Sequence, residues 1–386
     1  MQHFKIGLLV FLVFSFKAWS YPDFISYGYK SCLTCHYNGG GSGPLNDYGR
    51  ALFASEFTAN TFTSKTPDQL ADASGFLGAT ELPWWIRPGM KYRGLFYEKN
   101  VGSSQKVDKW INMQGDLDLA FHLDQSNQLV YVFNFGYIPT PLAQSPTESK
   151  PANWISKSNY LRWQLQKGLM VYAGLFDKFF GIRHADHTAV NRAVIGLGQS
   201  DQSTGVALQY SQEQYEAVAN LFFGNFNQDK EVRQVGASLM YEYYLDKTLT
   251  LGGSLLQSES DFKKEGRIAL HSRLGFAKGK SFMFELGLFD NASKTSVDKS
   301  NQGSYAFLQG LIGLSKGYNF LTSFQFLKND MKTSNGAESD RLGVGLLMFP
   351  FQKTEFRLEV VNNRQAAVAS SADDTWNLQS QVHLSW

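Results

Sequence analysis

The amino-acid sequence predicts an all-β fold, an antiparallel transmembrane β-barrel of about 16 strands that follows a small α-helical module. Three observations predict it: long stretches that alternate with period two, connections that are short and long in turn, and an aromatic residue at the end of the last alternating stretch. The length of 386 residues allows one large domain or two ordinary ones. The predicted divisions are residues 1–20, 21–60, 61–87 and 88–386.

The barrel prediction rests first on the alternation in residues 88–386. Within residues 110–123, apolar residues such as Leu117 share one face, while Asp116 and Asp118 share the opposite face. The same alternation occurs in residues 355–360 and 376–386. A soluble all-β protein also has alternating strands. Here, however, the stretches often reach ten residues or more, whereas strands of soluble sheets average about five to six.

The connections in this region alternate in length. Seven short turns are predicted near residues 124–128, 166–168, 212–214, 246–248, 278–280, 316–318 and 352–353. Eight longer loops are predicted near residues 98–109, 139–153, 177–201, 224–232, 258–266, 290–303, 328–340 and 362–374. Seven turns and eight loops join sixteen strands, with fourteen and eighteen as the alternatives. An even number of strands places the short turns of an outer-membrane barrel in the periplasm and the long loops outside.

The first 20 residues have the pattern of an export signal. Lys5 gives a positive start, residues 6–16 form an apolar run that includes one serine, and Ala18 with Ser20 fits a small-x-small cleavage site before Tyr21. A membrane anchor is the alternative, but the eleven residues of this run are too few, because a transmembrane helix needs about 20. We therefore predict a signal peptide and, with the barrel, location in a Gram-negative outer membrane.

The charge of the chain bears on its partners. Removing the signal peptide removes two lysines and no acid, which brings the formal net charge from +2 to zero. A neutral chain lacks the positive excess with which proteins bind nucleic acids, so we expect no nucleic-acid partner. We expect contact with outer-membrane lipid through strands, because no later stretch is apolar for long enough to form a transmembrane helix. Aromatic girdles at the two membrane interfaces are expected to include Trp84, Trp85, Trp110, Trp154 and Trp163.

The chain has two cysteines, and they stand three residues apart with a histidine next to the second. In a motif of this kind each thiol adds to a vinyl group of a haem, and the histidine binds the iron. Cys32 and Cys35 are therefore predicted to form the thioether bonds of one covalent haem c, with His36 as the proximal axial ligand. A disulfide in an oxidising compartment and a redox-active cysteine pair in a thioredoxin-like context are the alternatives.

The sixth ligand of the iron is harder to find in the sequence, because neither His nor Met occurs between His36 and Met90. Met90 is the candidate, and a Tyr, a Lys or an open position are the alternatives. An open position would permit peroxidase-like chemistry. The sequence otherwise shows no pair of residues at a spacing typical of a catalytic site, so we expect no enzymatic activity.

Short helices are predicted around the haem motif. Apolar residues recur at helical spacing from Leu45 to Phe53, which predicts one helix with an apolar face towards the haem. In the linker, residues 61–87, Thr66 is followed by a proline and by Gln69, the pattern of an N-cap, a first-turn proline and a capping box. Between the two helices, residues 58–66 are polar and turn-rich, which favours a flexible strap.

The longest predicted loop, residues 177–201, joins the fifth and sixth strands. Its charged and ionisable residues include Arg183, His184, Asp186, His187 and Arg192. This arrangement resembles the general porins, in which the third outer loop folds inward and narrows the pore. The resemblance implies a charged constriction that selects solutes. A solvated surface loop is the alternative.

The haem motif is followed by Leu-Asn-Asp-Tyr-Gly-Arg at residues 45–50. Together the two sequences resemble exported bacterial monohaem c-type cytochromes, which carry a Leu-Asn-x-(Tyr/Phe)-Gly-Arg box after Cys-x-x-Cys-His. The resemblance covers about 20 residues. The combination with a barrel also resembles, in part, the porin–cytochrome conduits that move electrons across an outer membrane, although those normally place a separate multihaem protein inside the barrel.

Two functions fit these features. The first is a haem c-binding outer-membrane protein that takes part in electron transfer with periplasmic electron carriers or other cytochromes. The alternative is a porin or transporter whose lumen is plugged or gated by a haem-bearing periplasmic domain. In either case, the polar residues expected in the lumen include Lys91, Arg93, Asp116, Asp118, Arg162, Glu242, Arg267, Arg273, Arg357, Glu359 and His383.

Overall fold

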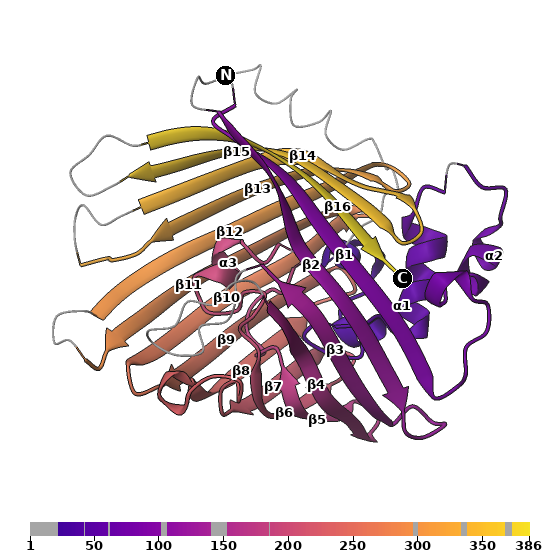
Figure 1. The fold of residues 1–386 in the computed structure, drawn as a ribbon, viewed down its shortest axis with the longest axis horizontal. Helices are drawn as coiled ribbons and strands as arrows, with labels where there is room; N and C mark the ends of the chain where they lie inside the picture. Colours follow the sequence, from indigo (N-terminus) through magenta and orange to yellow (C-terminus); the bar gives the residue numbers. More distant parts are fainter. Residues whose placement is uncertain are drawn as a thin grey trace.

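The computed structural model describes residues 22–41, 43–60, 62–101, 106–139, 153–184, 186–295, 300–332, 338–366 and 373–386 (Figure 1). The predicted signal peptide, residues 1–20, lies outside them. Sixteen described strands form one closed barrel, in which each strand pairs antiparallel with its neighbours in the chain and the last strand pairs with the first. The predicted sixteen-stranded antiparallel barrel is confirmed.

The strands are β1 (Ile86–Lys99), β2 (Val107–His122), β3 (Leu129–Ile138), β4 (Asn153–Gln166), β5 (Leu169–Phe176), β6 (Ser203–Ser211), β7 (Tyr215–Phe222), β8 (Val235–Tyr244), β9 (Leu249–Glu259), β10 (Lys263–Ala277), β11 (Lys280–Ser293), β12 (Ser300–Ser315), β13 (Tyr318–Lys328), β14 (Glu338–Phe351), β15 (Thr354–Ala366) and β16 (Asp373–Ser385). The described α-helices are α1 (Asp47–Leu52), α2 (Pro67–Asp72) and α3 (Val190–Ala193). Helix α2 begins with the predicted capping box of Thr66 and Gln69.

The seven short turns lie at one end of the barrel, at the positions predicted, and we call this the short-turn end. Helices α1 and α2 and the C-terminus lie at the same end (Figure 1). At the opposite, long-loop end, the predicted loop 139–153 falls almost wholly outside the described residues. The predicted long loop 258–266 is wrong: its connection is only residues 260–262, because β9 and β10 keep pairing as far as Glu259 and Lys264.

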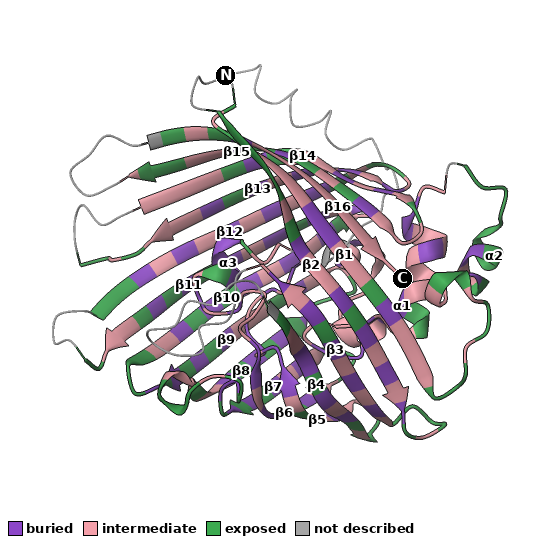
Figure 2. Ribbon diagram, in the orientation of Figure 1, coloured by how far each residue is buried: buried purple, intermediate pink, exposed green. Residues whose placement is uncertain are grey.

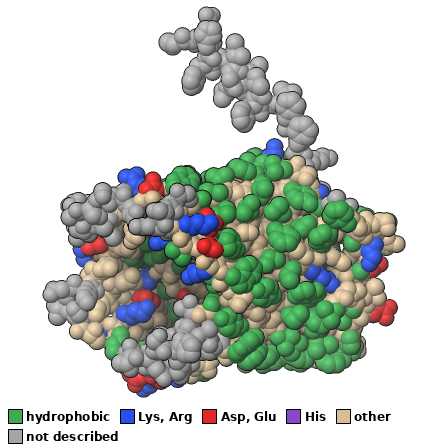
Figure 3. Space-filling view, turned by 45° about the horizontal axis from the view of Figure 1, so that its top comes forward, with side chains coloured by type: hydrophobic (Ala, Val, Ile, Leu, Met, Phe, Trp, Pro, Cys, Tyr) green, Lys and Arg blue, Asp and Glu red, His purple; other side chains and the backbone are tan. Residues whose placement is uncertain are grey.

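Buried residues alternate with more exposed ones along many of the strands (Figure 2). On β11, Met283 and Glu285 are fully buried, whereas their neighbours Phe282 and Leu286 are exposed. Hydrophobic side chains form a broad belt over the visible outer face (Figure 3). An apolar band outside and a mixed polar face inside is the pattern of a barrel that spans a lipid bilayer.

The aromatic and charged residues follow the predicted sides of the wall. The five predicted tryptophans are 46–61% exposed, and so is Trp376: Trp84, Trp85, Trp110, Trp154, Trp163 and Trp376. Trp85 stacks on Phe121 near the short-turn end, and Trp154 stacks on Phe135 towards the long-loop end. The predicted lumen residues are buried (Arg93, Asp116, Asp118, Arg162, Glu242, Arg267, Arg273 and Glu359) or line cavities (Lys91, Arg357 and His383). Among the described helices, none is long and apolar enough to cross a membrane.

Residues 22–60, which we call the N-terminal module, lie at the short-turn end and reach into the lumen. Ser26 packs so closely on β10 that a Cβ added to Gly275 would lie 2.4 Å from the Ser26 Cα. The Arg273 guanidinium, also on β10, donates a hydrogen bond to the Lys30 carbonyl at 3.0 Å. The module therefore packs against the barrel wall as a plug of short helices and loops.

The end of the module is hydrogen-bonded to the barrel. The flexibility predicted for residues 58–66 is therefore wrong at the start of that segment. The backbone amides of Ala59 and Asn60 donate to the carbonyls of Phe349 and Pro350 at 2.8 and 3.0 Å. These acceptors lie at the short-turn end of β14. Because the two partners are remote in sequence, a polar, turn-rich composition carries no sign of this attachment.

Candidate functional site

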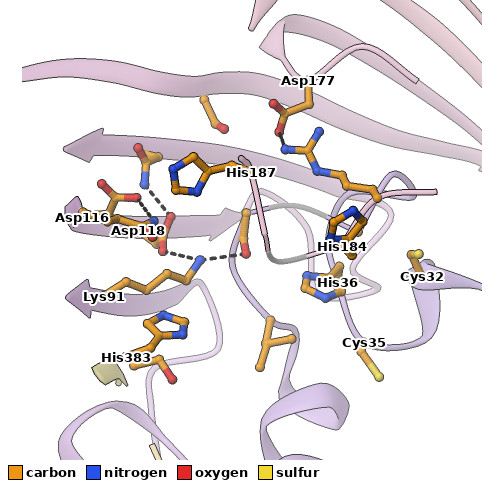
Figure 4. Close-up of a pocket in the computed structure, with 18 of the residues that line it drawn as sticks. Cys32, Cys35, His36, Lys91, Asp116, Asp118, Asp177, His184, His187 and His383 are labelled. Atoms are coloured by element: carbon orange, nitrogen blue, oxygen red, sulfur yellow. Dashed lines mark hydrogen bonds and ion pairs between the residues drawn. The ribbon is translucent and has the colours of Figure 1, made fainter. Parts of the chain in front are cut away.

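The Cys-x-x-Cys-His motif forms a tight turn that brings its three reactive side chains to one cavity. Residues Cys32–Thr34 form a 3₁₀ turn, and the Cys35 and His36 amides donate to the Cys32 carbonyl at 3.1 and 2.9 Å. Both cysteines carry free thiols. Cys32, Cys35 and His36 all line a cavity of about 320 Å³ in the lumen, partly open to solvent, which we call the main cavity (Figure 4).

Asn46 holds this turn in place. Its backbone amide donates to the Cys35 carbonyl at 2.9 Å, and its side-chain amide donates to the Thr34 carbonyl at 3.1 Å. The Asn46 Oδ1 atom also accepts a hydrogen bond from the Gly49 amide at 2.8 Å and so caps α1. A Cβ on Gly49 would lie 2.5 Å from the Cys35 carbonyl oxygen. The Leu-Asn-x-Tyr-Gly-Arg box is therefore the support on which the motif rests.

The glycine-rich loop after the motif allows the chain to enter the lumen. A Cβ on Gly39 would lie 1.9 Å from the Gln209 side chain on β6, and the Gly39 amide donates to the Tyr172 hydroxyl at 3.2 Å. Gly41 has a φ of +78°, and its hypothetical Cβ would lie 3.1 Å from the Cys32 Sγ. Only glycine permits both the close approach and the left-handed backbone.

Burial sets the protonation of the three motif side chains. Burial, helped by the positive charges of Lys91 and Arg183, lowers the pKa of His36 to about 4, so its imidazole is neutral at pH 7. The His36 Nδ1 atom is buried without a hydrogen-bond partner. Burial raises the pKa of Cys32 to about 12 and that of Cys35 to about 11, so both thiols stay protonated. A neutral imidazole is the form that binds a metal.

The apolar wall of the main cavity was predicted only in part. Leu45 and Phe53, from the predicted apolar helix face, line the cavity. Sequence reasoning missed Phe24 and Tyr29, which also line it, and the Phe24 ring is stacked on Phe57 with ring centroids 4.2 Å apart. The signal that could have identified this wall is the run of aromatic residues directly before the motif. Apolar walls with a few polar groups are typical of cofactor pockets.

A smaller cavity of about 50 Å³ shares Leu45, Phe53 and Lys91 with the main cavity. Arg50 and Lys353 add two more cationic side chains to its lining. The Arg50 Nη1 atom is buried without a hydrogen-bond partner. Asp118 also lines this cavity and pairs with Lys91 at 2.9 Å, so Arg50 is the group there that suits a carboxylate through a charge-assisted hydrogen bond.

Residues 177–202, which we call the inner loop, cross the lumen and attach to the opposite wall. The Gly181 amide donates to the Ser254 hydroxyl at 3.0 Å, and the Ile182 amide donates to the Glu285 carboxylate at 2.6 Å. Further along, the Val190 amide donates to the Gln325 side chain at 2.9 Å. These contacts bring the loop to β9, β11 and β13. The inner loop therefore folds inward, as the resemblance to general porins implied.

The predicted residues of the inner loop lie on two sides of it. Those that line the main cavity are Arg183, His184, His187 and Arg192. Asp186 instead lines another cavity of about 230 Å³, together with Arg357 and Glu359, which we call the outer cavity. The inner loop is therefore a partition between the two spaces.

Three of these residues are held by local contacts. Arg183 pairs with Asp177 at 2.6 Å. The His184 ring stacks on Phe307 with centroids 4.4 Å apart, and its Nε2 is hydrogen-bonded to the Asn191 Oδ1 at 2.9 Å. The Arg192 guanidinium donates to the carbonyls of His184 and Leu197 at 2.6 and 3.2 Å, which fixes the loop backbone. Arg192 thus serves the loop conformation as well as the cavity charge.

Met90, the predicted candidate for the sixth iron ligand, lies away from this site. Its side chain is 39% exposed on the outer face of β1, whereas the next residue, Lys91, lines the main cavity. Adjacent residues on a strand point to opposite faces. Met90 therefore faces the surroundings of the barrel and does not line the main cavity.

Asp186 joins the inner loop to the barrel wall and makes this attachment sensitive to acid. Its carboxylate lies 3.7 Å from Arg357 and 3.9 Å from Arg341. Although burial alone raises it, the positive charges of Arg357 and Arg341 hold the pKa of Asp186 below its ordinary value. Because its pKa is lowered, the ionised Asp186 carboxylate stabilises the folded loop at every pH above the ordinary pKa of an aspartate. This stabilisation is lost as pH falls through the lowered pKa.

We expect the inner loop of wild-type protein to become sensitive to pepsin as pH falls below about 4, the ordinary pKa of an aspartate. In Asp186→Asn the loop should be cut already at pH 5, with a weaker dependence on pH, because the charge that titrates is absent. Asp229→Asn, at an exposed aspartate outside the inner loop, is the control. Equal pH profiles for wild type and Asp186→Asn would contradict this role.

The sequence matches no protein-family model and no curated protein. Solved structures are similar in fold. OmpT, an outer membrane protein of Vibrio cholerae, has a TM-score of 0.61 at 7% identity, over 79% of this chain and 99% of that chain. The outer membrane channel DcaP of Acinetobacter baumannii has a TM-score of 0.59 at 10% identity, over 78% of this chain and 97% of that chain. An anion-selective porin from Comamonas acidovorans has a TM-score of 0.57 at 8% identity, over 78% and 99%.

At such low identity the likeness concerns the fold alone. The fold that these structures share with this chain is a closed antiparallel barrel, and the Cys-x-x-Cys-His turn is a feature of this chain's own lumen. The protein is therefore a porin-like, sixteen-stranded β-barrel with an N-terminal module inside its short-turn end.

Proposed function

We propose that this chain is an outer-membrane protein that holds one covalent haem c in the short-turn end of its barrel and takes part in electron transfer there. One observation carries the proposal: Cys32, Cys35 and His36 line the same lumen cavity from a single clamped turn. A disulfide would need neither a neighbouring histidine nor a cavity in front of it. A c-type haem needs both, because the macrocycle must lie beside the thioethers and against the histidine.

The residues around the main cavity fit a haem. The cavity volume of about 320 Å³ lies within the roughly 300–1,000 Å³ of ordinary ligand pockets, and the cavity is partly open to solvent. His36 is neutral and has an unpaired nitrogen. Phe24 and Phe53 offer apolar surface, and Arg50 offers an unpaired guanidinium nitrogen for a haem propionate.

The chain's own residues prepare this site for attachment. When bound, the haem supplies one-electron redox chemistry. Each thiol S–H adds across a vinyl C=C bond, so a C–S bond forms, the hydrogen passes to carbon and no oxidant is consumed. The resulting thioethers cannot ionise, which suits the burial that keeps Cys32 and Cys35 protonated. The hydrogen bonds of Asn46 to the Cys35 and Thr34 carbonyls hold the turn in place.

The proposed orientation places the haem on the periplasmic side. Short turns of outer-membrane barrels face the periplasm, and the N-terminal module lies at the short-turn end. The predicted export signal and the outward apolar belt support an outer-membrane location. Periplasmic electron carriers or other cytochromes are then the partners that can reach the module.

A porin or transporter with a haem-bearing plug is the second candidate. Two observations favour it: the solved structures of similar fold include an outer membrane channel and an anion-selective porin, and the inner loop enters the lumen as a partition. The two candidates differ in one measurable property, which is whether the intact barrel conducts ions.

We expect the purified full-length protein to carry haem, to be oxidised and reduced reversibly in an optical redox titration, and to show little steady conductance in a planar lipid bilayer. A blocked pore with a redox-active haem supports electron transfer. Steady open conductance from a chain without covalent haem would overturn the proposal in favour of the porin.

A further inference from the structure

His383 shares the main cavity with the haem motif. It lies near the end of β16, the strand that closes the barrel against β1, where it stands opposite Arg93. Its side chain lines the main cavity together with His36 (Figure 4). His36 belongs to the plug and His383 to the wall, so two histidines from independent parts of the chain face one space.

The hydrogen bond of His383 orients its ring for a metal. The Nδ1 atom lies 3.2 Å from the Glu355 Oε2 on β15. An ionised carboxylate only accepts hydrogen bonds, so Nδ1 carries the proton and Nε2 keeps its lone pair. A carboxylate on the far nitrogen is the usual outer partner of a metal-binding histidine, because it fixes the ring and raises its basicity.

The other ring nitrogen of His383 has no hydrogen-bond partner among the described residues. Its Nε2 atom is buried and makes no hydrogen bond to them. A buried acceptor of this kind destabilises the fold when it stays unsatisfied. A group that fills the main cavity and accepts the lone pair of Nε2 would remove this cost, and a haem iron is such a group.

The other histidines of the main cavity are less suited. The His184 Nε2 is already hydrogen-bonded to Asn191, and its ring is stacked on Phe307. His187 lines the cavity from the inner loop, and no described carboxylate is hydrogen-bonded to its ring. His383 alone among these three combines a carboxylate partner with a buried, unpaired second nitrogen among the described residues.

We propose that His383 is the sixth, distal ligand of the haem iron, with Glu355 as the residue that positions it. This inference rests on the proposed covalent haem c. The haem then joins the N-terminal module to the last strand of the barrel through two axial histidines. Two imidazole ligands give a six-coordinate, low-spin iron, which leaves no open position for peroxidase-like chemistry.

The test is the spin state of the haem in the full-length protein. Wild type is expected to show a low-spin electron paramagnetic resonance signal and no binding of carbon monoxide in the ferrous state. His383→Ala should lose the low-spin signal and bind carbon monoxide, and added imidazole should restore the low-spin spectrum. His383→Met should keep six ligands but raise the reduction potential, because a thioether favours ferrous iron. Glu355→Gln should keep the low-spin signal with a raised potential, since a neutral amide makes the imidazole less basic.

His184→Ala and His187→Ala are the matched controls and should both stay low-spin. Haem staining after denaturing electrophoresis and heat-modifiable migration of each variant establish that haem and barrel are intact. A low-spin His383→Ala variant, or loss of the low-spin signal in His187→Ala instead, would overturn the assignment while leaving the covalent haem in place. A wild-type chain without covalent haem would overturn the proposed function itself, and this inference with it.

Discussion

Replacing Cys32 and Cys35 by alanine together is expected to remove all covalently bound haem from the chain. The two thiols are the only ones in the sequence, so no other thioether can form. Wild-type protein should keep a haem-stained band in a denaturing gel and show an α-band on reduction. The double variant should lose both signals completely, because a haem held only by His36 dissociates when the chain unfolds.

The single variants Cys32→Ala and Cys35→Ala test the chemistry further. Each keeps one thioether, so the haem stain should persist at a reduced level. Heat-modifiable migration should be unchanged in every variant, because the barrel closes through its own strands. A haem stain that survives in the double variant, or that is missing from the wild type, would refute the covalent attachment.

Deleting residues 21–64 behind an intact export signal is expected to open the pore. The N-terminal module fills the short-turn end: the Tyr37 hydroxyl is hydrogen-bonded to His122 at 2.9 Å and Gly39 packs on Gln209. A sixteen-stranded barrel without such a plug encloses an aqueous channel. Conductance in a planar bilayer should therefore rise by about an order of magnitude or more, up to the limit set by the inner loop.

The Cys32→Ala, Cys35→Ala double variant is the matched control for this deletion. It keeps the module and lacks only the covalent haem, so it separates blockage by peptide from blockage by haem. We expect it to stay closed, because the module's hydrogen bonds to the wall do not involve the thiols. Unchanged conductance after the deletion, with heat-modifiable migration intact, would show that the module does not plug the pore.

The barrel was predictable because membrane strands carry their environment in their sequence. Each strand meets lipid on one side and the lumen on the other, so Phe282 and Met283 alternate as the pattern requires. Adjacent residues on a strand face opposite sides, so the alternation that predicted Lys91 in the lumen also predicts Met90 on the outer surface. The sequence therefore held enough information to exclude Met90 as an iron ligand. The loop at 258–266 was mispredicted because polar residues can extend a strand beyond the membrane, where composition no longer distinguishes strand from loop.

The candidate haem site could be proposed from the sequence for a different reason. Covalent haem attachment needs two thiols and a histidine within one turn, and Cys32, Cys35 and His36 are neighbours in the sequence as well as in space. The support by Asn46 and Gly49 is also local, and its residues were visible as part of the Leu-Asn-x-Tyr-Gly-Arg box. Their roles were not visible, because residue types alone do not show that a Cβ on Gly49 would come within 2.5 Å of the Cys35 carbonyl oxygen.

The sequence by itself predicted about sixteen strands, the side that each residue presents and the position of the Cys-x-x-Cys-His motif, because these depend on local spacing and on polarity. Only the tertiary structure decided that the module enters the lumen, that the Ala59 amide is hydrogen-bonded to β14 and that the inner loop separates the main cavity from the outer cavity. It alone also brought His383 to the cavity of His36. Those contacts join residues that are remote in sequence, and they arise only when β16 closes on β1 and encloses a space that the module and the inner loop can fill.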